Sequence, residues 1–199
     1  MKILHKIFIG STVLFLIGCS AVDTTANEFQ LSAFSIKQTT AKHGLQTLLV
    51  TAPEAVSGYQ TAAMLYIRKP YKLETFAKNA WADPPGDMLY PLITESLQRS
   101  GYFFAVASST NGEVVDYRLD TQLLRLQQNF LKKPSEIDLA VKVVLNNVKQ
   151  NRVIASKVIS LQIPCLADTP YAGVVAANKG TMQLTEQITQ FVLDQVKNS

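Results

Sequence analysis

The sequence predicts an α+β domain in which two main helices pack on one face of a mainly antiparallel sheet. Three consecutive segments, 117–126, 137–145 and 153–163, alternate apolar and polar residues, as strands with one buried face do. The segments 88–97 and 172–196 instead repeat apolar residues at helical spacing. Strands followed by helices in this order are typical of a single layered α+β domain.

The first half of the chain contains several short apolar or alternating stretches bounded by turn residues. We expect strands at 28–36 with a register change, at 45–50 before Pro53, at 62–67 before Pro70, and at 71–76.

The helices are predicted from their boundary residues as well as from their apolar stripes. Pro84 and Pro85 suit the first turn of a helix, and Gly101 suits its end. A brief strand is expected at 102–106. Gly180 lies inside the closing helix and costs about 1 kcal/mol of helix stability relative to alanine. A kink at this residue and a later start of the helix are therefore two alternatives to a straight helix.

The strands of the second half form a predicted meander with turns at 132–135 and 146–151. Leu124 and Leu126 fall on the opposite parity from the preceding apolar residues, which predicts a β-bulge.

Residues 1–20 have the organisation of an export signal. Lys2 and Lys6 precede a mostly apolar run, 7–17, which is too short to span a bilayer. Gly18 and Cys19 follow, and the stretch resembles the lipobox of bacterial lipoproteins, in which the cysteine thiol receives a diacylglyceryl group. The resemblance implies a cleaved signal peptide at 1–18, a lipidated tether at 19–28 and a domain at 29–199. The alternative is an ordinary secretory signal with an incidental cysteine.

A lipidated Cys19 would anchor the domain to a membrane, because two acyl chains hold a soluble domain stably. The residue after the cysteine, Ser20, favours the outer membrane over the inner membrane. We therefore expect a lipid-anchored protein on the periplasmic face of the cell envelope.

The charge balance gives little reason to expect a nucleic acid partner. Loss of Lys2 and Lys6 with the signal leaves 17 of the 19 basic residues against 15 acidic ones. Basic residues do cluster at Arg68, Lys69 and Lys72, and again at Lys132 and Lys133. A solvated strand or turn explains both clusters most simply, and contact with anionic lipid head groups is the alternative.

No motif of an enzyme, metal site or cofactor site is present, so we expect no catalysis, no metal and no cofactor. The candidate reactive groups are few. Cys165 is expected to be a buried structural thiol, and His43, the single histidine after the signal, has loop-like neighbours. Two carboxylate pairs, Asp83 with Asp87 and Asp116 with Asp120, are expected to serve structure rather than acid–base chemistry.

Aromatic residues crowd one third of the chain. Most are expected to pack in the core, although a tryptophan beside prolines is also able to anchor a partner. The residues concerned are Tyr59, Tyr66, Tyr71, Trp81 and Tyr90.

The order of elements resembles the ABC-type transport auxiliary lipoprotein family, which includes the paraquat-inducible protein C-like lipoproteins. The resemblance covers most of the mature chain and contains no catalytic signature. It is carried by Cys19, Leu48 to Pro53, Met64 to Tyr66, Trp81 with Pro84 and Pro85, Leu89 to Gly101 with Phe103 and Val106, Tyr117 to Leu119, and the helix from Ala176 to Val196.

The resemblance implies partners: an MCE-domain protein and the permease and ATPase of an ABC transporter, in a system that moves phospholipid or other hydrophobic molecules. We therefore expect a membrane-anchored accessory subunit. Direct contact with phospholipid is an additional candidate interaction. Two other functions stay open, a pilotin-like assembly lipoprotein of a secretion complex and an envelope enzyme that uses Cys165 or a carboxylate pair.

Overall fold

The computed structural model describes residues 26–39, 44–108 and 115–198. Within them the chain forms nine strands and two helices. In order these are β1 (Asn27–Phe29), β2 (Thr47–Val50), β3 (Glu54–Ala55), β4 (Ala63–Lys69), β5 (Lys72–Trp81), α1 (Pro85–Arg99), β6 (Ala105–Ala107), β7 (Tyr117–Asn129), β8 (Glu136–Asn147), β9 (Arg152–Pro164) and α2 (Pro170–Lys197).

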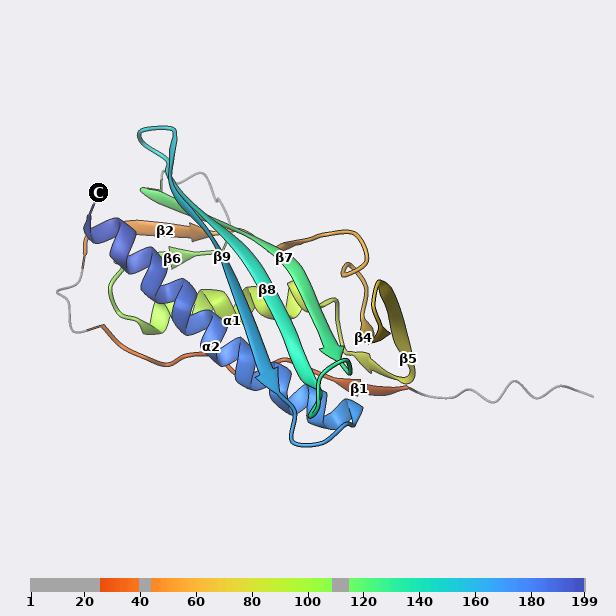
Figure 1. The fold of residues 1–199 in the computed structure, drawn as a ribbon. Coiled ribbons are helices and arrows are strands. Elements are labelled where there is room, and N and C mark those ends of the chain that lie inside the picture. Colours follow the sequence, from red (N-terminus) through yellow and green to blue (C-terminus); the bar gives the residue numbers. More distant parts are fainter. Residues whose placement is uncertain (1–25, 40–43, 109–114, 199) are drawn as a thin grey trace, which may run out of the picture.

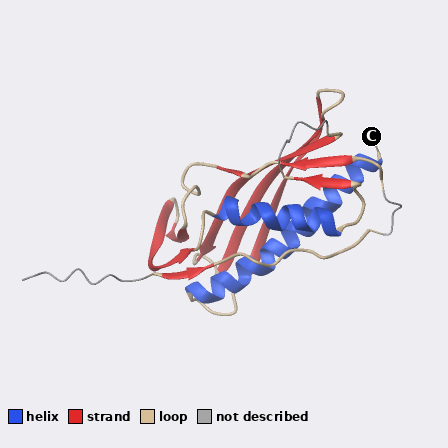
Figure 2. Ribbon diagram, turned by 180° about the vertical axis from the view of Figure 1, so that it is seen from behind, coloured by secondary structure: helices blue, strands red, loops and turns tan. Residues whose placement is uncertain are grey.

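The described strands form one sheet, and both helices cover the same face of it (Figures 1 and 2). The predicted α+β class and the single helix layer are confirmed. The longest ladders are antiparallel and join β7 to β8 and β8 to β9. The predicted meander and the predicted bulge are both present, the latter as a register shift between Leu123 and Arg125.

Strand β7 organises the rest of the sheet. One of its edges pairs with β8 along its whole length, and the other edge pairs in turn with β2, β3 and β4. These three pairings are parallel, as are those of β1 with β5 and β2 with β6. The short strands of the first half are therefore placed by parallel pairing, which their sequences do not indicate.

The first expected strand, 28–36, was wrong for most of its length. Only Asn27 to Phe29 form a strand, so β1 also takes in the last two residues of the expected tether. Residues 30–39, which we name the attachment segment, are not assigned to a strand. Their backbone groups bond to helix side chains instead of to a neighbouring strand.

Helix α1 begins and ends where its boundary residues predict, and α2 begins two residues before the apolar stripe that predicts it. Pro85 opens α1, and Gly101, with φ of 69°, follows its end. Helix α2 opens with Pro170, and Thr169 Oγ1 accepts a hydrogen bond from the Ala172 N–H. The helix continues through Gly180, where an added Cβ would lie 3.1 Å from Ile163 on β9. Close approach to the sheet therefore explains this glycine.

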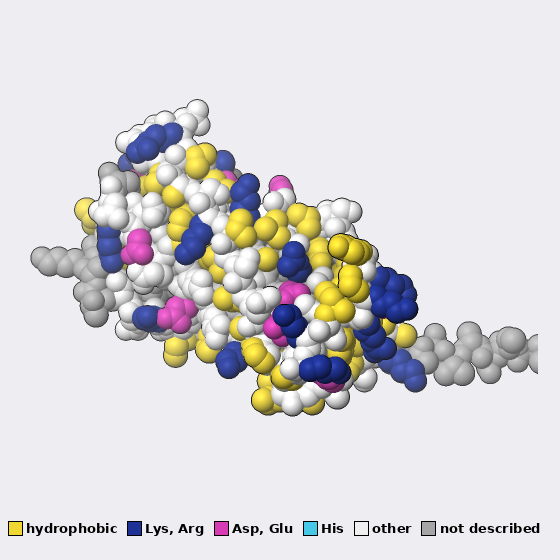
Figure 3. All heavy atoms as spheres, viewed as in Figure 1, with side chains coloured by type: hydrophobic (Ala, Val, Ile, Leu, Met, Phe, Trp, Pro, Cys, Tyr) yellow, Lys and Arg dark blue, Asp and Glu magenta, His cyan; other side chains and the backbone are white. Residues whose placement is uncertain are grey.

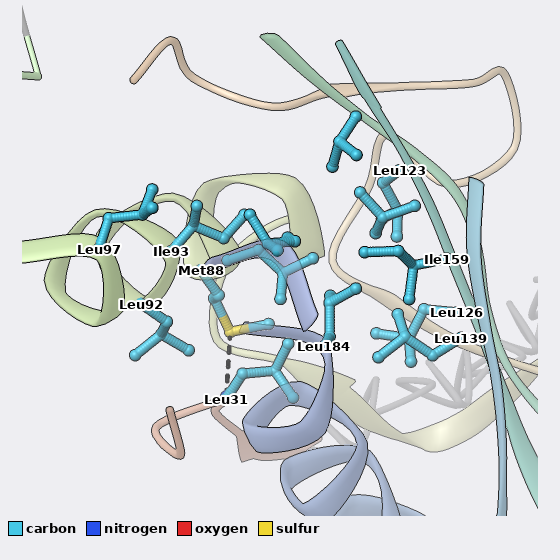
Figure 4. Packing of buried hydrophobic residues seen from close by; sticks show 14 of the residues in the cluster. Leu31, Met88, Leu92, Ile93, Leu97, Leu123, Leu126, Leu139, Ile159 and Leu184 are labelled. Atoms are coloured by element: carbon cyan, nitrogen blue, oxygen red, sulfur yellow. Dashed lines mark hydrogen bonds between the residues drawn. The ribbon is translucent and has the colours of Figure 1, made fainter. Parts of the chain in front are cut away.

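The hydrophobic core lies between the two helices and the sheet. Figure 4 shows α1 side chains and Leu184 of α2 facing side chains of β7, β8 and β9. The labelled residues are Leu31, Met88, Leu92, Ile93, Leu97, Leu123, Leu126, Leu139, Ile159 and Leu184, all of them buried.

Candidate functional site

The described chain starts at the edge of the sheet, next to the end of β5. Asn27 pairs with Asn79 and Phe29 pairs with Trp81, in parallel register. Because β1 runs parallel to β5, Asn27 is the residue of β1 nearest to the β4–β5 turn. Cys19, the predicted lipidation site, lies outside the described residues, eight positions before Asn27.

One side chain of α2, Asn178, makes several of the hydrogen bonds that hold the attachment segment. Asn178 Oδ1 accepts hydrogen bonds from the N–H groups of Ser32 and Ala33, at 2.8 and 3.2 Å. Its Nδ2 donates to the Gln30 carbonyl oxygen at 3.1 Å. One amide thus satisfies three backbone groups that a sheet would otherwise pair.

Further contacts extend this attachment to both helices. The Ser35 N–H donates to Thr185 Oγ1 at 2.9 Å, on the next turns of α2. Leu31 is buried against α1, and its N–H points to Met88 Sδ at 3.5 Å (Figure 4). The attachment segment, which follows β1, is therefore joined to both helices.

Replacing Asn178 with alanine tests this connection. We expect a loss of about 1 kcal/mol in the free energy of unfolding, because three backbone groups lose their partner. Amide hydrogen exchange at Ser32 and Ala33 should accelerate, and urea unfolding should give the stability change. Gln187→Ala, on the exposed face of α2, is the matched control. Unchanged exchange at Ser32 and Ala33 would contradict the assigned role.

Cys165 is a buried thiol at the joint between the sheet and α2. Gln128 Nε2 donates to its Sγ at 3.7 Å, and the Cys165 N–H donates to the Ser135 carbonyl at 2.7 Å. Burial raises the pKa of the thiol, so it is protonated at neutral pH and is a poor nucleophile. The expected burial of Cys165 is confirmed. His43 lies outside the described residues.

Asp168 lies at the surface beside the same connection between the sheet and α2. Its carboxylate accepts hydrogen bonds from Lys133 Nζ at 2.9 Å and from the Ser135 N–H at 2.8 Å. These two donors, the Lys133 ammonium first, lower the pKa of Asp168 from 3.8 to about 2.

The lowered pKa of Asp168 predicts a defined acid sensitivity. A carboxyl group whose pKa falls on folding stabilises the protein above its unfolded pKa, and this contribution disappears as the pH falls toward the folded value. Between pH values just above 3.8 and about 2, the wild type should therefore lose more stability than Asp168→Asn. Urea unfolding across this range is the measurement, with the exposed Asp83→Asn as control. If the free energy of unfolding falls with pH by the same amount in the wild type and in Asp168→Asn, the prediction is refuted.

Of the two carboxylate pairs, Asp116 and Asp120 make structural contacts. Asp116 accepts from the Thr47 N–H at 2.7 Å and pairs with Lys149 at 2.6 Å, and Lys149 lowers the pKa of this carboxyl. Asp120 accepts from Thr51 Oγ1 at 3.0 Å. Both carboxylates thus hold β2 and the following turn beside β7. Asp116 lies just before β7 and Asp120 lies on it, and each carboxylate has its own partners. The other pair, Asp83 and Asp87, is exposed at the start of α1.

Four of the five crowded aromatic residues pack against the domain. Trp81 is 4% exposed at the end of β5, which confirms packing over partner anchoring. Tyr66 stacks on Phe76, with 4.4 Å between ring centroids. The hydroxyls of Tyr59 and Tyr90 donate to Gln127 Oε1 and to the Val50 carbonyl. Tyr71, by contrast, is fully exposed.

The larger surface hollows are open and have mixed polar and apolar linings. One of about 660 Å³ lies along α1 and includes Tyr90, Glu95 and Arg99 in its lining. Another, of about 510 Å³, lies on the helix-free side of β7 beside Asp120 and Lys142. The mainly apolar hollow behind Trp81 measures about 10 Å³, which is too small for an acyl chain.

In the ranges that the structure describes, no group of three His, Cys, Asp or Glu side chains is placed to hold a metal ion. No helix in those ranges has the length and apolar character needed to cross a bilayer.

These features define a small α+β domain in which Cys165, Asp116 and Asp120 make structural contacts. The chain belongs to the family of ABC-type transport auxiliary lipoprotein components, which matches residues 29–189. The family inferred from the sequence is thereby confirmed, and with it a role as a lipoprotein auxiliary to ABC-type transport.

Solved structures support the same fold. Protein XCC0632 from Xanthomonas campestris aligns with a TM-score of 0.79 and 19% identity, over 86% of this chain and 98% of that chain. A second, uncharacterised protein aligns with a TM-score of 0.68 and 16% identity, over 84% and 99% of the two chains. No curated protein matches the chain.

Proposed function

We propose that this protein is a membrane-anchored accessory subunit of an ABC/MCE-type envelope transport system for phospholipids or other hydrophobic molecules. The observation that carries the proposal is the family match, which spans residues 29–189 and therefore nearly the whole domain. The proposed direct partners are an MCE-domain protein and the ABC permease and ATPase of the same system.

The proposed location follows from the N-terminus. Lipidation of Cys19 would hold the domain at a membrane, and Ser20 favours the outer membrane over the inner one. The attachment segment supports this proposal, because it ties the start of the domain to α1 and α2. A subunit held in this way is suited to dock a partner at a fixed distance from the lipid surface.

We further propose that the subunit works by protein contact and not by chemistry or by enclosing a lipid. Its larger hollows are open surface depressions with mixed polar and apolar linings, and the mainly apolar hollow behind Trp81 is too small to hold an acyl chain. The buried, protonated Cys165 supports the same conclusion.

Affinity purification tests the proposed partners. The full-length protein with a C-terminal tag is cross-linked in cells, and its partners are identified by mass spectrometry. We expect an MCE-domain protein together with the permease or ATPase. The control carries residues 1–28 fused to an unrelated domain, so that it shares the signal and anchor but not the fold. Recovery of a secretin without an MCE protein, or equal recovery with the control, would overturn the proposal.

A further inference from the structure

The fold brings the two basic clusters of the sequence together at one end of the sheet. The end of β4 runs parallel to the end of β7, with Tyr66 opposite Gln128 and Ile67 opposite Asn129. The Phe130 N–H then donates to the Ile67 carbonyl at 2.9 Å. The β4–β5 hairpin therefore lies beside the β7–β8 turn.

We name the resulting surface the basic end. Figure 3 shows Lys and Arg side chains gathered at the right, where this hairpin lies. The basic end comprises Arg68, Lys69 and Lys72 of the hairpin together with Lys132 and Lys133 of the turn, all of them exposed.

Only part of this positive charge is neutralised. Lys72 pairs with Glu74 and Lys133 with Asp168. Lys69 and Lys132 have no ion pair within the described chain, and the Arg68 guanidinium lies 4.9 Å from the centroid of the Tyr66 ring. Three bases thus remain available to an anionic partner.

Exposed apolar side chains stand among these bases. Tyr71 at the hairpin tip is fully exposed, and Leu73 and Leu131 are 42% and 45% exposed. Tyr71 has φ of 64°, a left-handed conformation that a bulky residue adopts at a cost and that glycine would adopt freely. A strained, solvent-exposed aromatic side chain favours a binding role over a packing role.

The start of the domain places this end near the proposed anchor. From Asn79, the partner of Asn27, to Lys72 at the tip is seven residues of strand, or about 23 Å. Cys19 lies eight residues before Asn27, a stretch with a reach of at most about 28 Å. A lipid on Cys19 could therefore insert beside the hairpin tip, but the domain could not move far from the bilayer.

We infer that the basic end docks on the anionic phospholipid head groups of the membrane that holds the anchor. Arg68, Lys69 and Lys132 would meet the phosphates, and Tyr71 would lie at the interface, where amphipathic aromatic rings are favoured. The inference rests on the proposed anchor for its geometry, and it adds a defined orientation of the domain on the membrane.

Vesicle binding tests the surface without the lipid anchor. The chain from residue 19 with Cys19→Ser should fold, because every described strand and helix lies between residues 27 and 197. It is sedimented with phosphatidylcholine vesicles and with vesicles of equal parts phosphatidylcholine and phosphatidylglycerol. We expect binding only to the anionic vesicles, decreasing as salt is raised.

Two sets of substitutions locate the binding surface. Replacing Arg68, Lys69 and Lys132 with glutamine should weaken binding about a hundredfold, since each base near an anionic surface strengthens binding about fivefold. The control replaces three exposed lysines elsewhere, Lys142, Lys157 and Lys179, with glutamine and should bind almost as wild type. Equal losses in the two triple variants, or no preference for anionic vesicles, would overturn the inference.

Tyr71→Gly separates binding from folding. It should weaken vesicle binding severalfold while the thermal midpoint stays the same or rises, because glycine removes the strain. A variant that keeps wild-type affinity would exclude Tyr71 from the surface. If the wild-type chain does not bind anionic vesicles but does copurify with an MCE-domain protein, this inference is refuted. The proposed function is not contradicted by that result.

Discussion

Exporting the chain with serine in place of Cys19 should move the whole protein from the membrane to the soluble periplasm. The physical reason is the size of the anchor, since each buried methylene contributes about 0.8 kcal/mol and two acyl chains contain many of them. The variant is best exported behind an ordinary cleavable signal, because an uncleaved residue 7–17 segment would itself hold the chain at the bilayer. Fractionation followed by immunoblotting is the measurement.

Cys165→Ala is the control for that experiment, because it removes the other cysteine and leaves the signal and Cys19 intact. It should stay in the membrane fraction. If the basic end contributes to docking, the Cys19→Ser chain should retain only weak, salt-sensitive membrane association. Salt-resistant membrane association of the Cys19→Ser chain would contradict lipid anchoring through Cys19.

Leu139→Ala should cost about 2–5 kcal/mol of the free energy of unfolding. Leu139 is completely buried in the middle of β8, and an added Cβ on Gly180 would lie 3.5 Å from its Cδ2. Truncating it removes apolar contacts at a place where α2 packs closely on the sheet, and it leaves a cavity that the helix backbone has little freedom to fill. Urea or thermal unfolding of the purified domain gives the change.

Leu166→Ala provides the matched control, because this leucine is 92% exposed in the connection before α2. Its effect should stay within about 0.5 kcal/mol. A loss below about 1 kcal/mol at Leu139, or equal losses at the two sites, would show that the layer between α2 and the meander is not the main core.

The second half of the fold was predictable because each of its long strands buries one face. Apolar and polar residues alternate over 137–145, which is long enough to predict both the strand and its buried face. Neighbouring antiparallel strands of a meander need only short turns between them. Helix α1 was predictable from its boundary residues Pro85 and Gly101, and α2 was predictable from its apolar stripe. The parallel pairings of β2, β3 and β4 with β7 were not, because these strands are short and their partners are distant in the sequence.

The same limit explains what was missed at the surface. Each basic cluster, read by itself, is consistent with a solvated turn, and only the pairing of β4 with β7 brings them together. The available signal was Tyr71 between Pro70 and Lys72, an aromatic residue at a turn tip flanked by bases. The expected strand at 30–36 was wrong because side chains of α2, above all Asn178, take the place of a strand partner.

The most direct test is the mass of the mature N-terminus, measured on protein purified from membranes in detergent and digested with a protease. The account predicts that the first peptide begins at Cys19 and carries a diacylglyceryl group. A peptide that begins at Cys19 or later with no acyl mass would contradict it, because the domain would then lack the anchor that the proposed subunit requires.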